Sequence, residues 1–440
     1  MKQLKIKDNS TVGKEYFTEI STVAKCIADK TFEQLDREGI FVFPEMIAET
    51  EDITKEQMIL QSVNDFYRSG NIMGYIGKGN ERLVITTRFS GTDNDFLFQY
   101  LLERVMDFPN FVDLETDVNS ENRLFNLLIV LFPYYLRKAA RKGIFKTYIQ
   151  NSYNDINVKG TIDIPRHIKQ NTPFVGKIAY NQREYSKDNF LMELIRHTIE
   201  FLKKKTYGSK ILNQIKDEVK LIVETTGAYN PCDKRKIIEL NKKNMVRHAF
   251  YQEYRALQQL CILILQNEKQ QIGMGTQRIY GILFDGAWLW EEYINLLVKD
   301  IFYHPMNKHK AGVQYLFADK KGKIYPDFIS KDSRKRIIAD AKYKPMDNIG
   351  NQDYLQLLAY MFRFDASSGL YFYPEVNDKN SLKLMVNKGV SYEKNVEPRE
   401  EVSIKKYGLK IPGSSGNYSD FVSKMKKNEE VFRNGILEYY

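Results

Sequence analysis

Cysteine and histidine are scarce in this sequence, and neither is spaced as a metal site requires. The three cysteines, Cys26, Cys232 and Cys261, lie far apart and form no CxxC pair. The five histidines show no ligand spacing either, so each is interpreted as a surface or core residue. The sequence therefore indicates neither a disulfide framework nor a zinc site, and a reducing compartment is expected.

Long apolar runs and low-complexity tracts are also missing. No stretch approaches the roughly 18 consecutive apolar residues of a membrane-spanning helix, and the N-terminus lacks the pattern of a signal peptide. With 43% hydrophobic and 28% charged residues, the 440-residue chain has the composition of a globular protein. We expect a soluble, cytoplasmic protein without membrane contact.

The charge balance is basic. Lys and Arg outnumber Asp and Glu by 66 to 56, which gives a net charge of +10 and favours an anionic partner without identifying it. The densest clusters are Lys203–Lys205 and Arg137–Lys142. Solvated helix faces and phosphate contacts explain these clusters equally well.

Hydrophobic periodicity divides the chain into three expected domains. Residues 1–155 mix helices with strands, and 72–89 alternates apolar residues around glycine-rich turns as β-hairpins do. Residues 156–275 open with a short strand at 157–168 and are otherwise mainly helical. Residues 276–440 show the order helix, three strands, helix, strand, followed by a C-terminal extension. The expected fold class is a mixed α+β and α/β multidomain protein.

The stretch Tyr325–Pro345, YPDFISKDSRKRIIADAKYKP, carries acidic residues on two expected strands. A turn at 331–334 joins these strands, so their pairing can bring Asp327 beside Asp340. Asp340 and Lys342 are two residues apart and therefore point to one face of the second strand. Two carboxylates that are buried together cost several kcal/mol unless a cation or protons offset their charge.

A divalent cation offsets this charge directly. Oxygen ligands suit Mg²⁺, and three are at hand in Asp327, Asp340 and the carbonyl of Ala341. Such an ion lowers the pKa of a bound water and stabilises the charge that develops on a phosphate, while Lys342 is placed to orient that water. A hairpin that merely happens to carry charge is the alternative, and these residues alone leave it open.

Residues on both sides of the hairpin add to this set. Glu291 lies on the expected helix before it, where an acid can reach the metal, and Glu292 competes with Glu291 by charge. On the helix after it, Asp353, Gln356 and Tyr360 share one face. Gln356 supports either a functional or a structural interpretation, whereas Tyr360 is interpreted as core packing. The adjacent apolar face is expected to consist of Leu355, Leu358, Ala359 and Phe362.

One pattern resembles that of the PD-(D/E)xK nuclease superfamily: Pro326-Asp327, then Asp340-Ala341-Lys342, with the helix after them. More narrowly, the chain resembles McrC, the nuclease subunit of McrBC-type 5-methylcytosine-specific restriction systems. The stretches that carry this second resemblance are LVITTRF, YLRKAARKGIFKTY, VKGTIDIPRHI, LWEEYINLL, YPDF and ADAKYKP. Their order along the chain, taken with the nuclease signature, is what makes it specific.

The resemblance implies a C-terminal endonuclease core of the restriction-enzyme type, with Asp327, Asp340 and Lys342 as catalytic triad and Glu291 and Gln356 in support. It implies Mg²⁺ as cofactor and double-stranded, methylcytosine-containing DNA as substrate. It also implies an McrB-like AAA+ GTPase hexamer as partner, which the N-terminal domain contacts and stimulates. No GxxxxGK[ST] motif occurs here, so GTP would be bound by that partner.

Within the N-terminal domain, Arg88 is the basic residue that we would expect to contact the motor. Two other functions stay open. The chain can be a PD-(D/E)xK nuclease of another defence or repair pathway that acts alone or with an ATPase. It can also be a non-catalytic assembly subunit, although retention of Asp327, Asp340 and Lys342 argues against that.

Overall fold

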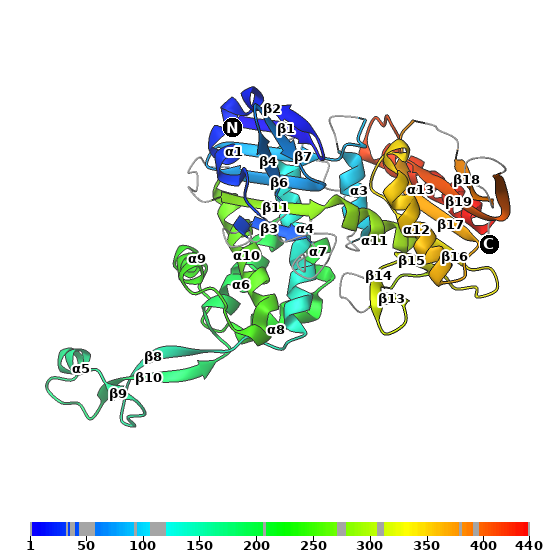
Figure 1. The fold of residues 1–440 in the computed structure, drawn as a ribbon. Coiled ribbons are helices and arrows are strands. Elements are labelled where there is room, and N and C mark those ends of the chain that lie inside the picture. Colours follow the sequence, from blue (N-terminus) through cyan, green and yellow to red (C-terminus); the bar gives the residue numbers. More distant parts are fainter. Residues whose placement is uncertain are drawn as a thin grey trace. The chain divides into compact units, whose positions relative to one another are not determined.

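The computed structural model describes residues 2–31, 34–35, 40–43, 58–91, 95–105, 120–205, 208–270, 279–305, 312–377, 381–389 and 396–438. The chain forms two compact units, one made of Met1–Val112 with Gly275–Tyr440 and the other of Asp113–Met274 (Figure 1). The mixed α/β fold class is confirmed. The division differs from the three expected domains in two ways. The N-terminal and C-terminal segments share the first unit, and the boundary expected at residue 155 falls inside the second unit.

A five-stranded sheet in the first unit explains this division. In spatial order its strands are β1 (Lys2–Lys7), β7 (Glu81–Thr86), β6 (Ile72–Lys78), β11 (Ile279–Asp285) and β3 (Ile40–Phe43). β6 and β7 pair antiparallel, which confirms the hairpin predicted at 72–89. β11, more than one hundred and fifty residues further along the chain, is inserted between β6 and β3 and so ties the C-terminal segment to this sheet.

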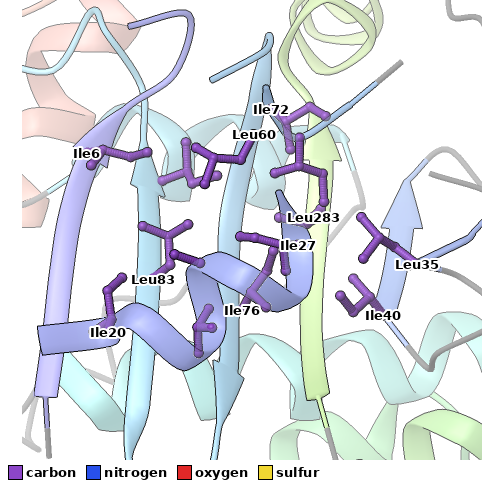
Figure 2. Close-up of a cluster of buried hydrophobic side chains, with 14 of the residues drawn as sticks. Ile6, Ile20, Ile27, Leu35, Ile40, Leu60, Ile72, Ile76, Leu83 and Leu283 are labelled. Atoms are coloured by element: carbon purple, nitrogen blue, oxygen red, sulfur yellow. The ribbon is translucent and has the colours of Figure 1, made fainter. Parts of the chain in front are cut away.

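One apolar cluster covers this sheet. The segment formed by the 3-10 helix η1 (Lys14–Ile20) and α1 (Ser21–Ile27) lies across it, and Ile20 and Ile27 are fully buried there. Figure 2 shows these side chains among those of the strands, including Leu83 and Leu283. Gly74 of β6 permits the close approach of β11, because a Cβ at this residue would lie 2.1 Å from the Ile282 carbonyl oxygen.

Smaller elements complete this part of the first unit. A three-stranded sheet is formed by β2 (Thr11–Gly13), β5 (Phe66–Ser69) and β4 (Leu60–Val63). Helix α3 (Phe96–Val105) begins after Asp95, whose carboxylate accepts hydrogen bonds from the Thr87 and Phe98 amides.

The second unit contains a group of helices. Its helices are α4 (Ser120–Ala140), α6 (Phe190–Lys203), α7 (Gly208–Asn213), α8 (Lys216–Thr225), α9 (Lys234–Lys243) and α10 (Gln252–Gln270), with short 3-10 helices η4 (Pro231–Asp233) and η5 (Ala249–Tyr251). α6 shows why they form: the Asn189 side chain caps its first turn, and its apolar residues recur at helical spacing to give a buried face.

A long β-ribbon in this unit was not predicted. β8 (Thr147–Asp155) and β10 (Ile178–Ser186) pair antiparallel, and their tip carries β9 (Thr161–Ile162) and α5 (Ile164–Gln170). The strand predicted at 157–168 is therefore wrong for most of its length. α5 forms there because Asp163 accepts a hydrogen bond from the Arg166 amide at 3.2 Å and Pro165 occupies the first turn.

A six-stranded sheet forms the rest of the first unit. In spatial order its strands are β12 (Phe302–Tyr303), β15 (Phe328–Ser330), β16 (Ile337–Ala341), β17 (Ser368–Glu375), β19 (Glu397–Lys410) and β18 (Leu382–Lys388). The elements beside it are α11 (Gly286–Val298), α12 (Asn351–Arg363), α13 (Tyr418–Leu437), the 3-10 helix η7 (Met346–Asn348) and the hairpin of β13 (Gln314–Phe317) and β14 (Lys321–Ile324). β15 and β16 are antiparallel, whereas β16, β17 and β19 run parallel.

No helix within these described ranges is both long enough and apolar enough to span a membrane.

Candidate active site

Asp327 and Asp340 stand opposite each other at one end of the β15–β16 pair. Phe328 faces Ala339 in this pair, and one further step of the antiparallel register sets Asp327 against Asp340. The Oδ2 atom of Asp327 accepts a hydrogen bond from the Ala341 amide at 2.9 Å. The structure thus brings the two predicted acids together.

Lys342 belongs to the same cluster. Its Nζ lies 2.6 Å from Asp340 Oδ2 and donates a hydrogen bond to Gln356 Oε1 at 3.2 Å. Burial by itself would lower the pKa of Lys342, but the carboxylates of Asp340 and Asp327 outweigh it and raise that pKa above its ordinary value. The amine is therefore held as a cation among acids.

The pKa of Asp327 is raised well above its usual range. Burial is the main cause, and the carboxylates of Glu291 and Asp340 raise it further because nearby negative charge disfavours ionisation. Lys342 opposes this shift without reversing it. Asp327 is therefore a buried carboxyl with two acidic neighbours and one cationic neighbour, Lys342.

Glu291 of α11 reaches the cluster together with a histidine. His304 Nε2 lies 3.7 Å from Glu291 Oε1 and 3.8 Å from Glu292 Oε1, while its Nδ1 lies 2.9 Å from the Asp327 carbonyl oxygen. Burial lowers the pKa of His304, but Glu292 and Glu291 raise it to above its ordinary value. Both glutamates thus contact His304, and Glu291 is the one that also acts on the Asp327 carboxylate.

The polar face of α12 meets this cluster. Gln356 links Lys342 to Tyr360, because its Oε1 accepts from Lys342 and its Nε2 donates to the Tyr360 hydroxyl at 2.8 Å. Asp353 lies 3.7 Å from Lys342 Nζ and 2.7 Å from Lys344 Nζ. Tyr360 is buried, as its interpretation as a packing residue requires.

The apolar face predicted for α12 is wrong in part. Leu355 and Phe362 are 62% and 87% exposed. The buried face consists of Leu357, Tyr360 and Met361. Apolar residues occur on both sides of this helix, so its periodicity alone does not select the side that meets the sheet.

Within the described part of the chain, no three side chains of His, Cys, Asp or Glu are grouped as a metal site. The expected donors are two carboxylates, of Asp327 and Asp340, and the carbonyl of Ala341, which follows Asp340 on β16. Two carboxylates with a carbonyl suit Mg²⁺, which keeps several of its waters when proteins bind it. The carboxylates of Glu291 and Asp340, which add to the effect of burial on the pKa of Asp327, also suit a cation.

Two titratable residues beside the catalytic candidates were not predicted. His304 precedes Asp327 by 23 residues and belongs to no motif, so no local pattern indicated it. Lys344 follows Lys342 by two residues, just beyond the end of β16 at Ala341, and this spacing was an available signal.

The sequence matches one protein family over most of its length. Residues 67–374 match the family described as McrBC 5-methylcytosine restriction system component. The chain belongs to the McrBC family. The matched range includes β15, β16 and α12, and therefore the whole cluster around Asp340. Among curated proteins, none matches this McrBC chain.

Solved structures were compared with this McrBC chain as well. A refined half-complex from a tetradecameric assembly of Thermococcus gammatolerans McrB AAA+ hexamers with bound McrC gives a TM-score of 0.51 at 15% identity, with 100% of both chains covered. At that identity the likeness shows the fold alone. The Thermococcus gammatolerans McrBC complex covers 68% of this chain and 88% of that chain at 16% identity, with a TM-score of 0.30.

Proposed function

We propose that this McrBC-family chain is the Mg²⁺-dependent DNA endonuclease subunit of a GTPase-driven restriction complex. The observation that carries the proposal is the convergence of Asp327, Asp340 and Lys342 at the end of the β15–β16 pair. Two acids and a lysine at the ends of adjacent strands, with Glu291 and Gln356 beside them, are what PD-(D/E)xK nucleases use to cut a phosphodiester.

Mg²⁺ is the cofactor that we assign to the oxygens of Asp327, Asp340 and Ala341. When bound, it supplies an activated water and stabilisation of negative charge on the phosphate. The two aspartates supply the charge that retains the ion. Glu291 strengthens the negative potential at Asp327, as the raised pKa of Asp327 indicates.

Lys342 supplies the positive charge that the chain itself brings to the phosphate. The ion pair with Asp340 and the hydrogen bond to Gln356 restrict its side chain to one position. From there the ammonium can hold a water or neutralise a phosphate oxygen. Tyr360 fixes the far side of the Gln356 amide, so α12 sets the position of this lysine.

The partner that we propose is an McrB-like AAA+ GTPase hexamer. The Thermococcus gammatolerans assembly, whose McrB AAA+ hexamers carry bound McrC, supports it together with the family match. Selection of methylcytosine-containing DNA is assigned to that partner. The present chain contributes the cleavage site and an anchoring element.

We assign motor docking to the β8–β10 ribbon. Figure 1 shows it projecting from the helices of its unit. Its tip exposes Ile156, Ile164, Phe174 and Val175, at 75%, 63%, 67% and 63%. Apolar side chains gathered on an exposed tip mark a protein contact. The docking element proposed is therefore this ribbon, whose tip and second strand lie beyond residue 155, in place of the N-terminal domain expected at 1–155.

Asp340→Asn tests the cleavage site, because it keeps the shape of the side chain and removes its charge. The chain, its AAA+ partner, GTP and Mg²⁺ are incubated with methylated and unmethylated plasmid. We expect wild-type chain to cut the methylated plasmid and Asp340→Asn to abolish cutting while still stimulating GTP hydrolysis. Asp365→Asn, an exposed aspartate after α12, is the matched control that should cut normally. Undiminished cutting by Asp340→Asn would refute the proposal.

A further inference from the structure

Arg88 lies at a junction between the five-stranded sheet and the segment that carries Lys342. It follows β7, and its side chain is only 13% exposed, which leaves little of it for the motor contact expected from the sequence. Nη1 donates to Asn71 Oδ1 at 2.9 Å, and Nη2 donates to the carbonyl oxygen of Tyr343. The buried carboxylate of Asp8 lies 3.6 Å away and balances its charge.

Tyr343, the residue directly after Lys342, is locked into this junction. Its ring lies 4.7 Å from the Arg88 guanidinium, and its hydroxyl donates to Thr87 Oγ1 at 2.9 Å. Only 4% of the residue is exposed. A Cβ at Gly286 would lie 2.6 Å from the ring, so the first residue of α11 has to be small.

The same junction holds α11, which carries Glu291. The Gly286 amide donates to the Asn71 carbonyl oxygen at 2.8 Å. Asn71 and Arg88 flank the β6–β7 hairpin, one before it and one after it. One hairpin therefore fixes the start of the helix with Glu291 and the end of the strand with Asp340.

We propose that Arg88 is a positioning residue for the nuclease site. It holds the Tyr343 carbonyl, and through the backbone it sets where Lys342 and Asp340 stand relative to Glu291. This proposal rests on the function proposed above. A displacement of about 1 Å in such a group can lower a rate about a hundredfold, so a side chain that touches no substrate can control cleavage.

Arg88→Lys tests the proposal, because it keeps the charge and loses the two-pronged contact with Asn71 and Tyr343. Amide hydrogen exchange of the peptide over 339–344 reads the position of the strand without any cleavage. Mn²⁺ affinity, measured by electron paramagnetic resonance of the free ion, reports whether the acidic residues still bind a cation. We expect exchange at Ala341 and Lys342 to accelerate about tenfold, Mn²⁺ affinity to fall about tenfold, and cleavage to fall about a hundredfold.

Two controls separate positioning from general damage. Tyr343→Phe keeps the carbonyl that Arg88 binds and loses the contacts of its hydroxyl with Thr87 and the Met73 sulfur, so it should affect Mn²⁺ binding less than Arg88→Lys does. Arg433→Lys changes a surface pair with Asp300 and should change nothing. Native exchange and native Mn²⁺ affinity in folded Arg88→Lys would overturn the proposal. A wild-type chain that neither binds Mn²⁺ nor cuts would instead overturn the nuclease function itself.

The hairpin β13–β14 carries a second, independent feature. Its register pairs Tyr315 with Lys323 and Phe317 with Lys321, so aromatic and basic side chains share one face. On the opposite face, Ile324 is buried in the core and Leu316 packs against the same cluster. This hairpin therefore presents two aromatic rings and two ammonium groups on the side away from the core.

This face is exposed except at Tyr315, which is half-buried, and its hairpin precedes Asp327 in the chain. Phe317 is 64% exposed, and Lys321 and Lys323 are exposed as well. The hairpin is fixed to α12, because Arg363 Nε donates to a β13 carbonyl at 2.7 Å. β14 ends at the residues that lead directly into Asp327.

We infer that this face contacts duplex DNA next to the scissile phosphate, given the nuclease function proposed above. Lys321 and Lys323 bind backbone phosphates, and Phe317 packs against the sugar and base edges. A lysine that neutralises a phosphate releases counterions, so its loss lowers the dependence of affinity on salt by about one unit of slope.

The double variant Lys321→Gln/Lys323→Gln tests this contact, with Lys426→Gln/Lys427→Gln on the exposed face of α13 as matched control. Binding of the chain with its AAA+ partner to duplex DNA is measured in Ca²⁺ over a range of salt. We expect affinity to fall about tenfold and the slope of log affinity against log salt to decrease by about two. An unchanged slope would overturn the assignment, and wild-type chain that binds no DNA would overturn the nuclease function.

Discussion

Lys342 and Asp340, two residues apart in sequence, form an ion pair with 2.6 Å between Nζ and Oδ2. The lysine ammonium thus already contacts one oxygen of that carboxylate. Asp327 and Glu291 add further negative charge at the same place. The pair therefore links the role of Lys342 as a cation at the phosphate to the role of Asp340 as a metal ligand. Whatever moves the lysine also changes what Asp340 can bind.

Replacing Lys342 separates these roles. Lys342→Gln keeps most of the length of the side chain and loses the charge. We expect single-turnover cleavage to fall by about 10²–10³, the usual effect of removing one group that stabilises developing charge. Mn²⁺ affinity should stay level or rise, because a competing cation is gone. Lys344→Gln removes a lysine whose ion pair within the described part of the chain is with Asp353, and it should lower cleavage about tenfold or less. Equal losses in the two variants would contradict the role of Lys342.

Asp95 should make stability depend on pH. Burial raises its pKa to about 7 in the folded chain, against an ordinary value near 3.8. The folded state therefore binds the proton more tightly, and this stabilisation is complete below about pH 4 and lost as pH rises through 7. The loss is on the order of 4 kcal/mol. Asp95→Asn should flatten the fall of the unfolding free energy between pH 5 and about 8 in urea titrations, and equal slopes for both proteins would contradict this account.

Substitutions at Gly74 and Gly79 test the close approach of β6 and β11 in the five-stranded sheet. Both have positive φ, of 136° and 58°, but only at Gly74 would a Cβ strike backbone, 2.1 Å from the Ile282 carbonyl oxygen. Gly74→Ala should therefore cost about 3 kcal/mol or more of unfolding free energy. Gly79→Asn has open space and a backbone conformation that asparagine tolerates, so it should cost less than about 1 kcal/mol. Chemical denaturation measures both, and similar losses would count against the close approach of β6 and β11.

Local patterns predicted some parts of this protein and missed others for physical reasons. The β15–β16 hairpin is local, so a period of two and one turn sufficed to bring Asp327 to Asp340. β11 pairs with β6 and β3 across a large sequence separation, and no local pattern encodes such a partner. The ribbon was missed because its strands are half-buried and polar, with TYIQNSYND in β8. His304 joins the acids through packing on Phe328, which only the fold determines.

The proposed docking of the ribbon predicts a separation of motor stimulation from metal binding. Ile164→Asp/Phe174→Asp places charge on two exposed apolar side chains at the tip, where it cannot be buried against a partner without a large cost. We expect stimulation of the partner's GTP hydrolysis to fall at least about tenfold, which corresponds to about 1.4 kcal/mol of lost contact. Mn²⁺ binding and thermal stability of the chain should not change.

Val431→Asp supplies the control for this docking variant, because Val431 on α13 is 69% exposed and lies outside the ribbon. It adds the same charge at a comparably exposed apolar position, so it should leave stimulation intact. If Val431→Asp reduced stimulation as strongly as the ribbon variant, the effect would follow from charge and not from the ribbon. If neither variant changed stimulation, the docking surface would have to lie on another element, and the exposed apolar tip would need a different partner.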